Sequence, residues 1–185
     1  MPSDEKVLKY LNDLKKEGLR PSLICAMIIK EKVGMFASNK YPGWEFVQGG
    51  MELNELPIDT FEREVLEELG YHFYRECHLP PKKMIWLFED QMKTRIKGNV
   101  ITAEGVEIKP TAKYYIIFAA EMNLEKFPEI DATDSGYSGS TVKLHKAKWV
   151  GYDEGLDLVR SIQSPQKREI IRKVLHKLKE KGLIK

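Results

Sequence analysis

The chain has 185 residues, the length of a single domain that can bury a hydrophobic core of its own. Hydrophobic residues make up 42% of it and charged residues 31%, an ordinary balance for a globular protein. The net charge of +2 is too small to indicate nucleic-acid binding by itself, and the sequence contains no internal repeat and no low-complexity tract.

The cysteines and the hydropathy pattern predict where the protein resides. Cys25 and Cys77 lack the spacing of a metal site, and Cys25 lies in an apolar run, so we expect a reduced thiol there and no disulfide framework. No apolar run reaches transmembrane length, and the charged N-terminus has no signal-peptide core. We therefore expect a cytoplasmic protein without a membrane partner.

Residues 3–16 predict a helix that forms an N-terminal extension over residues 1–18. Ser3 can cap its start, and Gly18 suits its end. Its apolar stripe, which we expect to pack on the domain, consists of Val7, Leu8, Leu11 and Leu14. A helix that binds a partner is the alternative.

Apolar and alternating runs predict a set of strands. Residues 23–29 form a continuous apolar run of the kind that is buried in a sheet, and residues 113–122 form the other clear strand. Further strands are expected over residues 34–37, 44–47, 71–76, 83–92 and 146–150, and a hairpin over residues 99–108 that turns at 103–105. Residues 123–141 predict a polar loop, and residues 156–162 a weak helix.

A last helix is predicted from Pro165 to Lys181, with Ser164 as its cap and Gly182 after its end. It makes residues 164–185 a basic C-terminal helix on an otherwise mixed domain. The element order therefore predicts an α/β fold with a mixed sheet between helices, in one domain over residues 1–185.

Residues 49–71 carry the strongest pattern in the chain. They fit G-x5-E-x7-R-E-U-x-E-E-x-G-U, where U is a bulky aliphatic residue and only Tyr71 departs by being aromatic. A chance match of its seven near-fixed residues is on the order of 10⁻⁷ per window at average residue usage. The matching positions are Gly49, Glu55, Arg63, Glu64, Val65, Glu67, Glu68 and Gly70.

A helix is predicted inside this pattern. Pro57 suits its first turn, although the capping-box spacing of Asp59 and Glu62 would also allow a start there, and Gly70 suits its end. An apolar side that would anchor it in a core consists of Ile58, Phe61, Val65 and Leu69.

Glu64, Glu67 and Glu68 crowd an adjacent arc of that helix at i, i+3 and i+4. Like charges at this spacing destabilise a helix by a few tenths of a kcal/mol per pair, roughly, so an offsetting interaction is expected. A hard divalent cation such as Mg²⁺ binds carboxylate oxygens and keeps positions open for water and phosphate. The alternative is a solvated acidic face in which Arg63 and Glu67 form an ordinary i,i+4 pair.

The pattern is that of the Nudix box, so the chain resembles the Nudix hydrolases. The resemblance implies an α/β/α sandwich. Its lead-in, residues 44–50, resembles the W-x-F-P-Q-G-G segment of bacterial RNA pyrophosphohydrolases and dinucleoside polyphosphate hydrolases, with Val47 in place of proline. Weaker counterparts follow in the same order at Trp86-Leu87, Lys113-Tyr114-Tyr115, Lys148-Trp149-Val150 and Gln166-Lys167-Arg168-Glu169.

The resemblance implies hydrolysis of a phosphoanhydride bond. Glu64, Glu67 and Glu68 would hold Mg²⁺, with Mn²⁺ as a substitute, together with a backbone carbonyl at Gly49 or Gln48. Glu64 or Glu68 would accept the proton of the attacking water, and the sequence does not choose between them. Arg63, paired with Glu55, would orient the carboxylates.

Many relatives carry a further metal-binding acid before the last strand. Glu129 is our choice, although counting back from Trp149 reaches Lys143 instead, and a solvated loop acid is the alternative. The candidate substrate-binding residues, each otherwise a surface charge, are Arg20, Lys113, Lys167 and Arg168. Where RNA-decapping relatives clamp a base, this chain has Ser164, Pro165 and Gln166.

The expected function is Mg²⁺-dependent cleavage of substrates that link a nucleoside diphosphate to another group, with RNA 5′ ends or dinucleoside polyphosphates as partners. A nucleoside triphosphate or nucleotide-sugar pyrophosphatase is the first alternative. The second is a non-catalytic regulator that binds nucleotide or RNA, although no box glutamate is lost. No DNA-binding module is evident, and the oligomeric state is left open.

Overall fold

The structure, a computed structural model, describes residues 3–38, 43–93, 96, 98–131 and 144–185. Lys143 and most of the expected polar loop, residues 132–141, lie outside the described residues. No helix in the described part of the chain is long and apolar enough to span a membrane.

Within the described residues the centre of the molecule is a seven-stranded mixed sheet of order β3–β2–β1–β8–β5, in which β4 also pairs with β1 and β9 with β2. Strands β1 and β8 run parallel at its centre, with Arg20 opposite Lys113, and the other pairs are antiparallel. A separate hairpin joins β6 to β7. The strands are β1 (Leu19–Ile29), β2 (Lys32–Ala37), β3 (Trp44–Glu45), β4 (Val47–Gly50), β5 (Lys83–Met92), β6 (Val100–Ile101), β7 (Glu107–Ile108), β8 (Ala112–Glu121) and β9 (Lys146–Val150).

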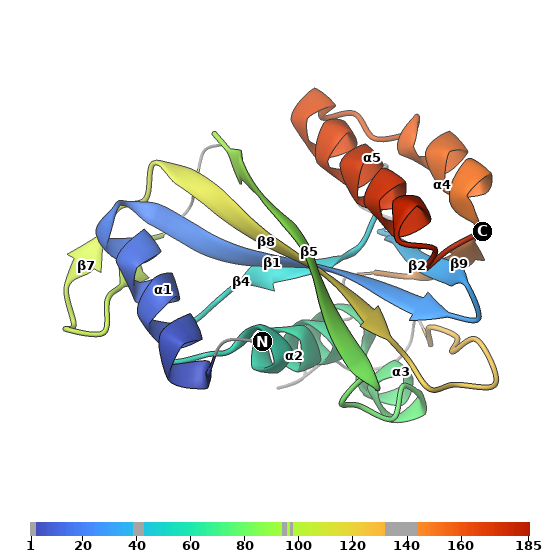
Figure 1. The fold of residues 1–185 in the computed structure, drawn as a ribbon, viewed down its shortest axis with the longest axis horizontal. Helices are drawn as coiled ribbons and strands as arrows, with labels where there is room; N and C mark the ends of the chain where they lie inside the picture. Colours follow the sequence, from blue (N-terminus) through green and yellow to red (C-terminus); the bar gives the residue numbers. More distant parts are fainter. Residues whose placement is uncertain (1–2, 39–42, 94–95, 97, 132–143) are drawn as a thin grey trace.

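Helices cover both faces of the sheet (Figure 1). They are α1 (Asp4–Lys16), α2 (Pro57–Leu69), α3 (Tyr71–Glu76), α4 (Tyr152–Val159) and α5 (Pro165–Glu180). Alternate residues of β1 point to opposite faces, so Leu23 and Cys25 pack with α1, α2 and α3, whereas Ile24 and Ala26 pack with α4 and α5. The expected α/β/α sandwich is confirmed.

Helix α2 begins at Pro57, as the first of its two predicted starts. The backbone N–H of Leu56 donates to Asp59 Oδ2 at 3.0 Å, so Asp59 caps the helix from its first turn. Phe61, Val65 and Leu69 are fully buried. The helix ends at Gly70, whose φ of 92° lies in the region that favours glycine.

The prediction of a strand over residues 71–76 is wrong, because these residues form helix α3. Phe73 is fully buried and Cys77 is 1% exposed, and this four-residue spacing places both on one helical face. Tyr71, which a strand would turn to the same face as Phe73, is 54% exposed. Six residues of apparent alternation are too few to separate the two periods.

The remaining elements lie where the sequence predicts them, but with other bounds: β1 begins four residues before the predicted strand, and the strand expected over residues 44–47 is divided into β3 and β4. Helix α1 buries Leu11 and Leu14 in the same core as α2, although the Ser3 side chain makes no cap hydrogen bond. Helix α4 starts four residues before the predicted weak helix. Cys25 and Cys77 are buried free thiols, and burial raises the pKa of both.

Replacing Phe61 tests how firmly the core holds α2. Phe61→Ala should lower the free energy of unfolding by about 3–5 kcal/mol, because a fully buried ring is lost from the core. Urea denaturation measures this change, with Phe61→Leu as the milder variant. Val106→Ala, at a side chain 55% exposed, should change the stability by less than about 0.5 kcal/mol. Equal effects at both positions would contradict the packing of α2.

Candidate active site

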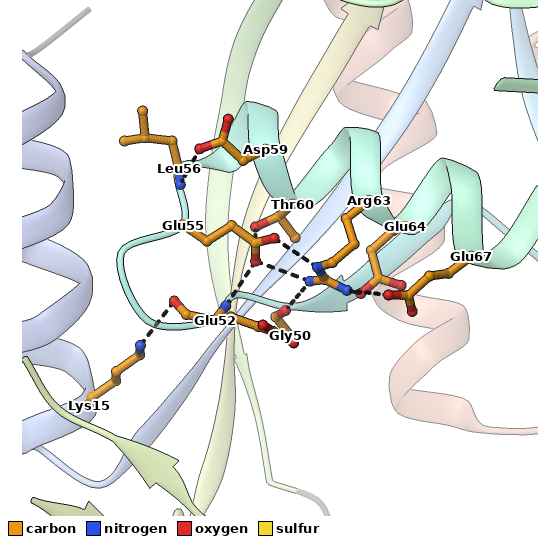
Figure 2. A network of polar contacts seen from close by, with 10 residues as sticks. All are labelled: Lys15, Gly50, Glu52, Glu55, Leu56, Asp59, Thr60, Arg63, Glu64 and Glu67. Carbon is orange, nitrogen blue, oxygen red and sulfur yellow. Dashed lines mark hydrogen bonds and ion pairs between the residues drawn. The ribbon is translucent and has the colours of Figure 1, made fainter. Parts of the chain in front are cut away.

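The carboxylate of Glu55 is the centre of a hydrogen-bond network at the start of α2 (Figure 2). Its Oε1 accepts from Arg63 Nε at 2.7 Å, and its Oε2 accepts from Arg63 Nη2 at 3.1 Å. Oε2 also accepts from the backbone N–H of Glu52 at 2.9 Å and from Thr60 Oγ1 at 2.8 Å. Burial opposes ionisation of Glu55, but these donors hold its pKa below the usual value.

Arg63 distributes its other donors over the glutamates and the preceding strand. Its Nη1 donates to Glu64 Oε1 at 2.6 Å and to Glu67 Oε1 at 3.4 Å, and its Nη2 donates to the Gly50 carbonyl at 2.8 Å. Arg63 therefore fixes the positions of Glu64 and Glu67 relative to β4. Burial opposes its charge, but Glu55 and Glu64 raise its pKa.

Two consecutive glycines of β4 admit two opposite charges. A Cβ on Gly49 would lie 1.7 Å from Glu64 Oε1, and a Cβ on Gly50 would lie 2.8 Å from Arg20 Nη2. A side chain at Gly49 would displace Glu64 as far back as its Cγ, 2.6 Å from that Cβ, whereas a side chain at Gly50 would require only the end of the Arg20 side chain to move. The carboxylate of Glu64, in a residue 5% exposed, and the guanidinium of Arg20 thus reach adjacent points of the same strand.

Glu68 faces the same strand, β4. The backbone N–H of Gln48 lies 3.5 Å from Glu68 Oε2, and the Glu68 carbonyl accepts from the backbone N–H of Leu144 at 2.9 Å. The structure therefore places Glu68 beside Gln48 and Glu64 beside Gly49, and Arg63 links Glu67 to Glu64. Their joint use as metal ligands stays a prediction.

The donor set suits a hard divalent cation. Its groups are carboxylate and carbonyl oxygens, the ligands that Mg²⁺ prefers, and Gly49 provides a cradle that a Cβ would fill. In the part of the chain that the structure describes, no three acidic, histidine or cysteine side chains already surround one point, and Arg63 bonds to Glu64 and Glu67. The residues thus fit a metal in their chemistry, although their side chains do not converge on one point in the described part of the chain, and the metal site stays a prediction.

Three of the four predicted substrate-binding cations come together beside the glutamates. Burial lowers the pKa of Lys113, and the nearby charges of Arg20 and Lys167 lower it further, whereas Glu64 and Glu45 raise it. Lys167 Nζ also forms an ion pair with Glu45. Half-buried cations next to carboxylates form a place where a phosphate group could lie.

The fourth cation, Arg168, points elsewhere. Its Nε and Nη2 donate to the carbonyl of Ile162 at 3.0 and 2.7 Å, so it holds the segment that leads into α5. Other basic residues of α5 form ion pairs: Arg172 with Glu169, Lys173 with Asp90 and Lys177 with Glu180. These pairs reduce the positive field that the sequence suggests for α5.

Glu129 lies beside α3. Its backbone N–H donates to Glu76 Oε2 at 3.3 Å, and its side chain is exposed. It is thus placed next to the end of α3, the helix that follows the Nudix box.

Sequence reasoning missed the partners that hold the site together. Glu45 and Lys167 are 122 residues apart, and no local pattern links them. Lys15 donates to the Glu52 carbonyl at 3.1 Å. The sequence does indicate that Lys15 is buried, because this residue follows Leu8 and Leu11 at the spacing of the apolar stripe. A lysine is unusual at such a position.

The sequence and the fold are both similar to those of known proteins. The sequence model described as "NUDIX domain" matches residues 19–174, most of the chain. The chain belongs to the Nudix family. It is therefore a Nudix hydrolase. Enzymes of this family generally require divalent metal ions and act on nucleotide-containing substrates. The similarity supports pyrophosphohydrolase activity.

Individual relatives agree with this assignment. The chain is 28% identical over 178 residues to the RNA pyrophosphohydrolase of Sulfurovum sp. (strain NBC37-1), covering 91% of this chain and 98% of that protein. A NUDIX hydrolase structure from Listeria monocytogenes str. 4b F2365 is similar with a TM-score of 0.53 and 17% identity, over 90% of this chain and 98% of that one. An ADP compounds hydrolase is similar with a TM-score of 0.52 and 13% identity, over 89% and 76%. The two structures support the fold alone.

Gly49→Ala tests the close approach of Glu64. The added methyl should lower the free energy of unfolding by about 1–3 kcal/mol, because it overlaps the Glu64 carboxylate. Thermal and urea denaturation measure the loss. In a Glu64→Ala background the same substitution should cost far less. An equal cost in both backgrounds would mean that Glu64 does not occupy this position.

Glu55→Gln tests the network through its pH dependence. Because the folded-state pKa of Glu55 is lowered, its charge stabilises the fold above the usual glutamate pKa, and this contribution is lost as pH falls through the lowered value. The free energy of unfolding of the wild type should therefore exceed that of Glu55→Gln by roughly 1–3 kcal/mol at pH 7. The difference should shrink below about pH 4.5. Urea titrations at pH 7 and pH 3 measure it, and a constant difference would refute the ionised Glu55.

Proposed function

We propose that this Nudix hydrolase uses Mg²⁺, or Mn²⁺ as a substitute, to cleave a phosphoanhydride bond in RNA 5′ ends or dinucleoside polyphosphates. The observation that carries the proposal is the Gly49–Gly50 pair, at which Glu64 and Arg20 approach the same strand. Carboxylates suited to a cation and basic groups suited to phosphates are adjacent there.

Each residue has a proposed role. Glu64, Glu67 and Glu68, with the carbonyl of Gly49 or Gln48, would hold the ion. A bound divalent cation supplies the positive charge that polarises phosphoryl oxygens and lowers the pKa of coordinated water. Glu64 or Glu68 accepts the proton of the attacking water, and Arg63 keeps the carboxylates oriented. Glu129 as a further ligand stays a prediction.

The cations beside the glutamates favour a substrate with several phosphates. Arg20, Lys113 and Lys167 lie close enough for their charges to interact, and they can bind oxygens of more than one phosphate once Lys167 exchanges Glu45 for the substrate. The similarity to a protein named RNA pyrophosphohydrolase, over nearly the full length of both chains, supports an RNA 5′ end. At the position of the base clamp, Ser164, Pro165 and Gln166 are exposed and non-aromatic. Binding should therefore depend on the phosphates more than on the identity of the first base.

A substrate panel with Mg²⁺ tests the proposal. Triphosphorylated RNA and diadenosine polyphosphates should be turned over faster than nucleoside triphosphates or nucleotide sugars. Glu68→Gln should lower kcat by roughly 10³-fold or more, because a metal ligand or base is lost. Glu62→Gln is the matched control, since it makes the same change on α2 beside Asp59.

The outcomes separate the alternatives. Preferred turnover of nucleoside triphosphates or nucleotide sugars would replace the proposed substrate class. The absence of turnover with every substrate, with Mn²⁺ as well and at several pH values, would support a non-catalytic binder. Near-normal activity of Glu68→Gln would refute the proposed metal site. Release of orthophosphate or pyrophosphate identifies the phosphorus that is attacked.

A further inference from the structure

Lys15 on α1 is a buried charged residue that the proposed reaction does not use. The residue is 4% exposed, and its Nζ donates to the backbone carbonyl of Glu52 at 3.1 Å. Burying an ammonium group is costly unless its contacts offset the loss of water. Helix α1 precedes residues 19–174, so this contact comes from outside the segment that matches the family.

The residue that Lys15 contacts is held from both sides. The carbonyl of Glu52 accepts from Lys15, and its N–H donates to Glu55 Oε2 at 2.9 Å. The surrounding segment has no regular structure, and Asn54 within it has a φ of 59°, in the left-handed region. A segment of this kind owes its shape to specific contacts, and the contact from Lys15 anchors one end of the Glu52–Glu55 hydrogen bond.

The same chain of contacts continues to the glutamates (Figure 2). Glu55 binds Arg63 through both carboxylate oxygens, and Arg63 binds Glu64 at 2.6 Å. Lys15 and Glu64 thus lie at opposite ends of one hydrogen-bonded series. Burial lowers the pKa of Lys15, whereas the charges of Glu55 and Glu52 raise it, so the amine faces the negative side of this network.

We propose that Lys15 is a positioning residue of the active site, which holds Glu55 and Arg63 through the Glu52 peptide and thereby aims Glu64 at the metal position. It touches neither substrate nor metal. The inference rests on the proposed metal site, but it is independent of which substrate is cleaved.

Lys15→Met tests this role, because methionine fills similar space without the amine. The Kd for Mn²⁺, measured without substrate from the EPR signal of the free ion, should rise roughly threefold to tenfold. Loss of a residue that supports a metal ligand typically lowers metal affinity by about 10–100-fold, so this effect is at or below the lower end of that range. In NMR spectra the Arg63 Nε–H, which donates to Glu55, should exchange faster with water. The kcat should fall with KM changed less than about twofold, because the phosphate-binding cations are untouched.

Two controls on α1 separate positioning from stability. Lys6→Met makes the same change at an exposed site and should leave all three measurements unaltered. Leu11→Ala removes buried packing beside Lys15 but keeps the amine, so it should lower stability without weakening Mn²⁺ binding. Lys15→Gln is measured in parallel, because its shorter side chain cannot make the same contact, and it provides the same test if Lys15→Met does not fold.

A double-mutant cycle checks the route. In a Glu55→Gln background, Lys15→Met should change the Mn²⁺ affinity by less than about twofold, because the series is already broken at Glu55. Full additivity would overturn the proposal, and so would unchanged Mn²⁺ affinity and Arg63 exchange in Lys15→Met. If wild type binds Mn²⁺ but cleaves none of the tested substrates, the substrate proposal fails while these measurements still decide the role of Lys15.

Discussion

The ion pair between Glu55 and Arg63 is the interaction on which the rest of the site depends. Both of its side chains are largely buried, with exposed fractions of 12% and 24%, so the desolvation of the charges offsets much of their attraction. Its value therefore lies in geometry more than in stability. Two hydrogen bonds fix the plane of the guanidinium, and the remaining donors then have only one direction in which to hold Glu64 and Gly50.

The two glycines of β4 complement that pair. A strand normally keeps side chains from other elements at the distance of its own Cβ atoms. At Gly49 and Gly50 this distance is lost, so Glu64 approaches from α2 and Arg20 from β1. Both approaches depend on the sandwich, because β4 pairs with β1 while α2 packs against the same strands. The backbone space at these two glycines thus lets opposite charges of the site reach adjacent points of one strand.

Residues 49–70 could be interpreted from sequence because their constraints are local. Pro57, Gly70 and the apolar spacing of Phe61, Val65 and Leu69 determine one helix, and the glutamate spacing follows from its period. Strand β8 and helix α5 were predicted for the same reason. Residues 71–76 were misassigned because both periods fit six residues, and only the core that receives Phe73 and Cys77 decides between them.

The contacts that sequence could not supply are long-range. Arg168 follows Lys167 directly, yet Lys167 reaches Glu45 whereas Arg168 turns back to the carbonyl of Ile162. Consecutive helical residues point about 100° apart, so a basic pair cannot face one ligand as a unit. Composition alone counts both as candidate phosphate binders. The direction of each side chain from α5, set by how Ile170 and Ile171 pack on the sheet, determines which of them lies near the carboxylates.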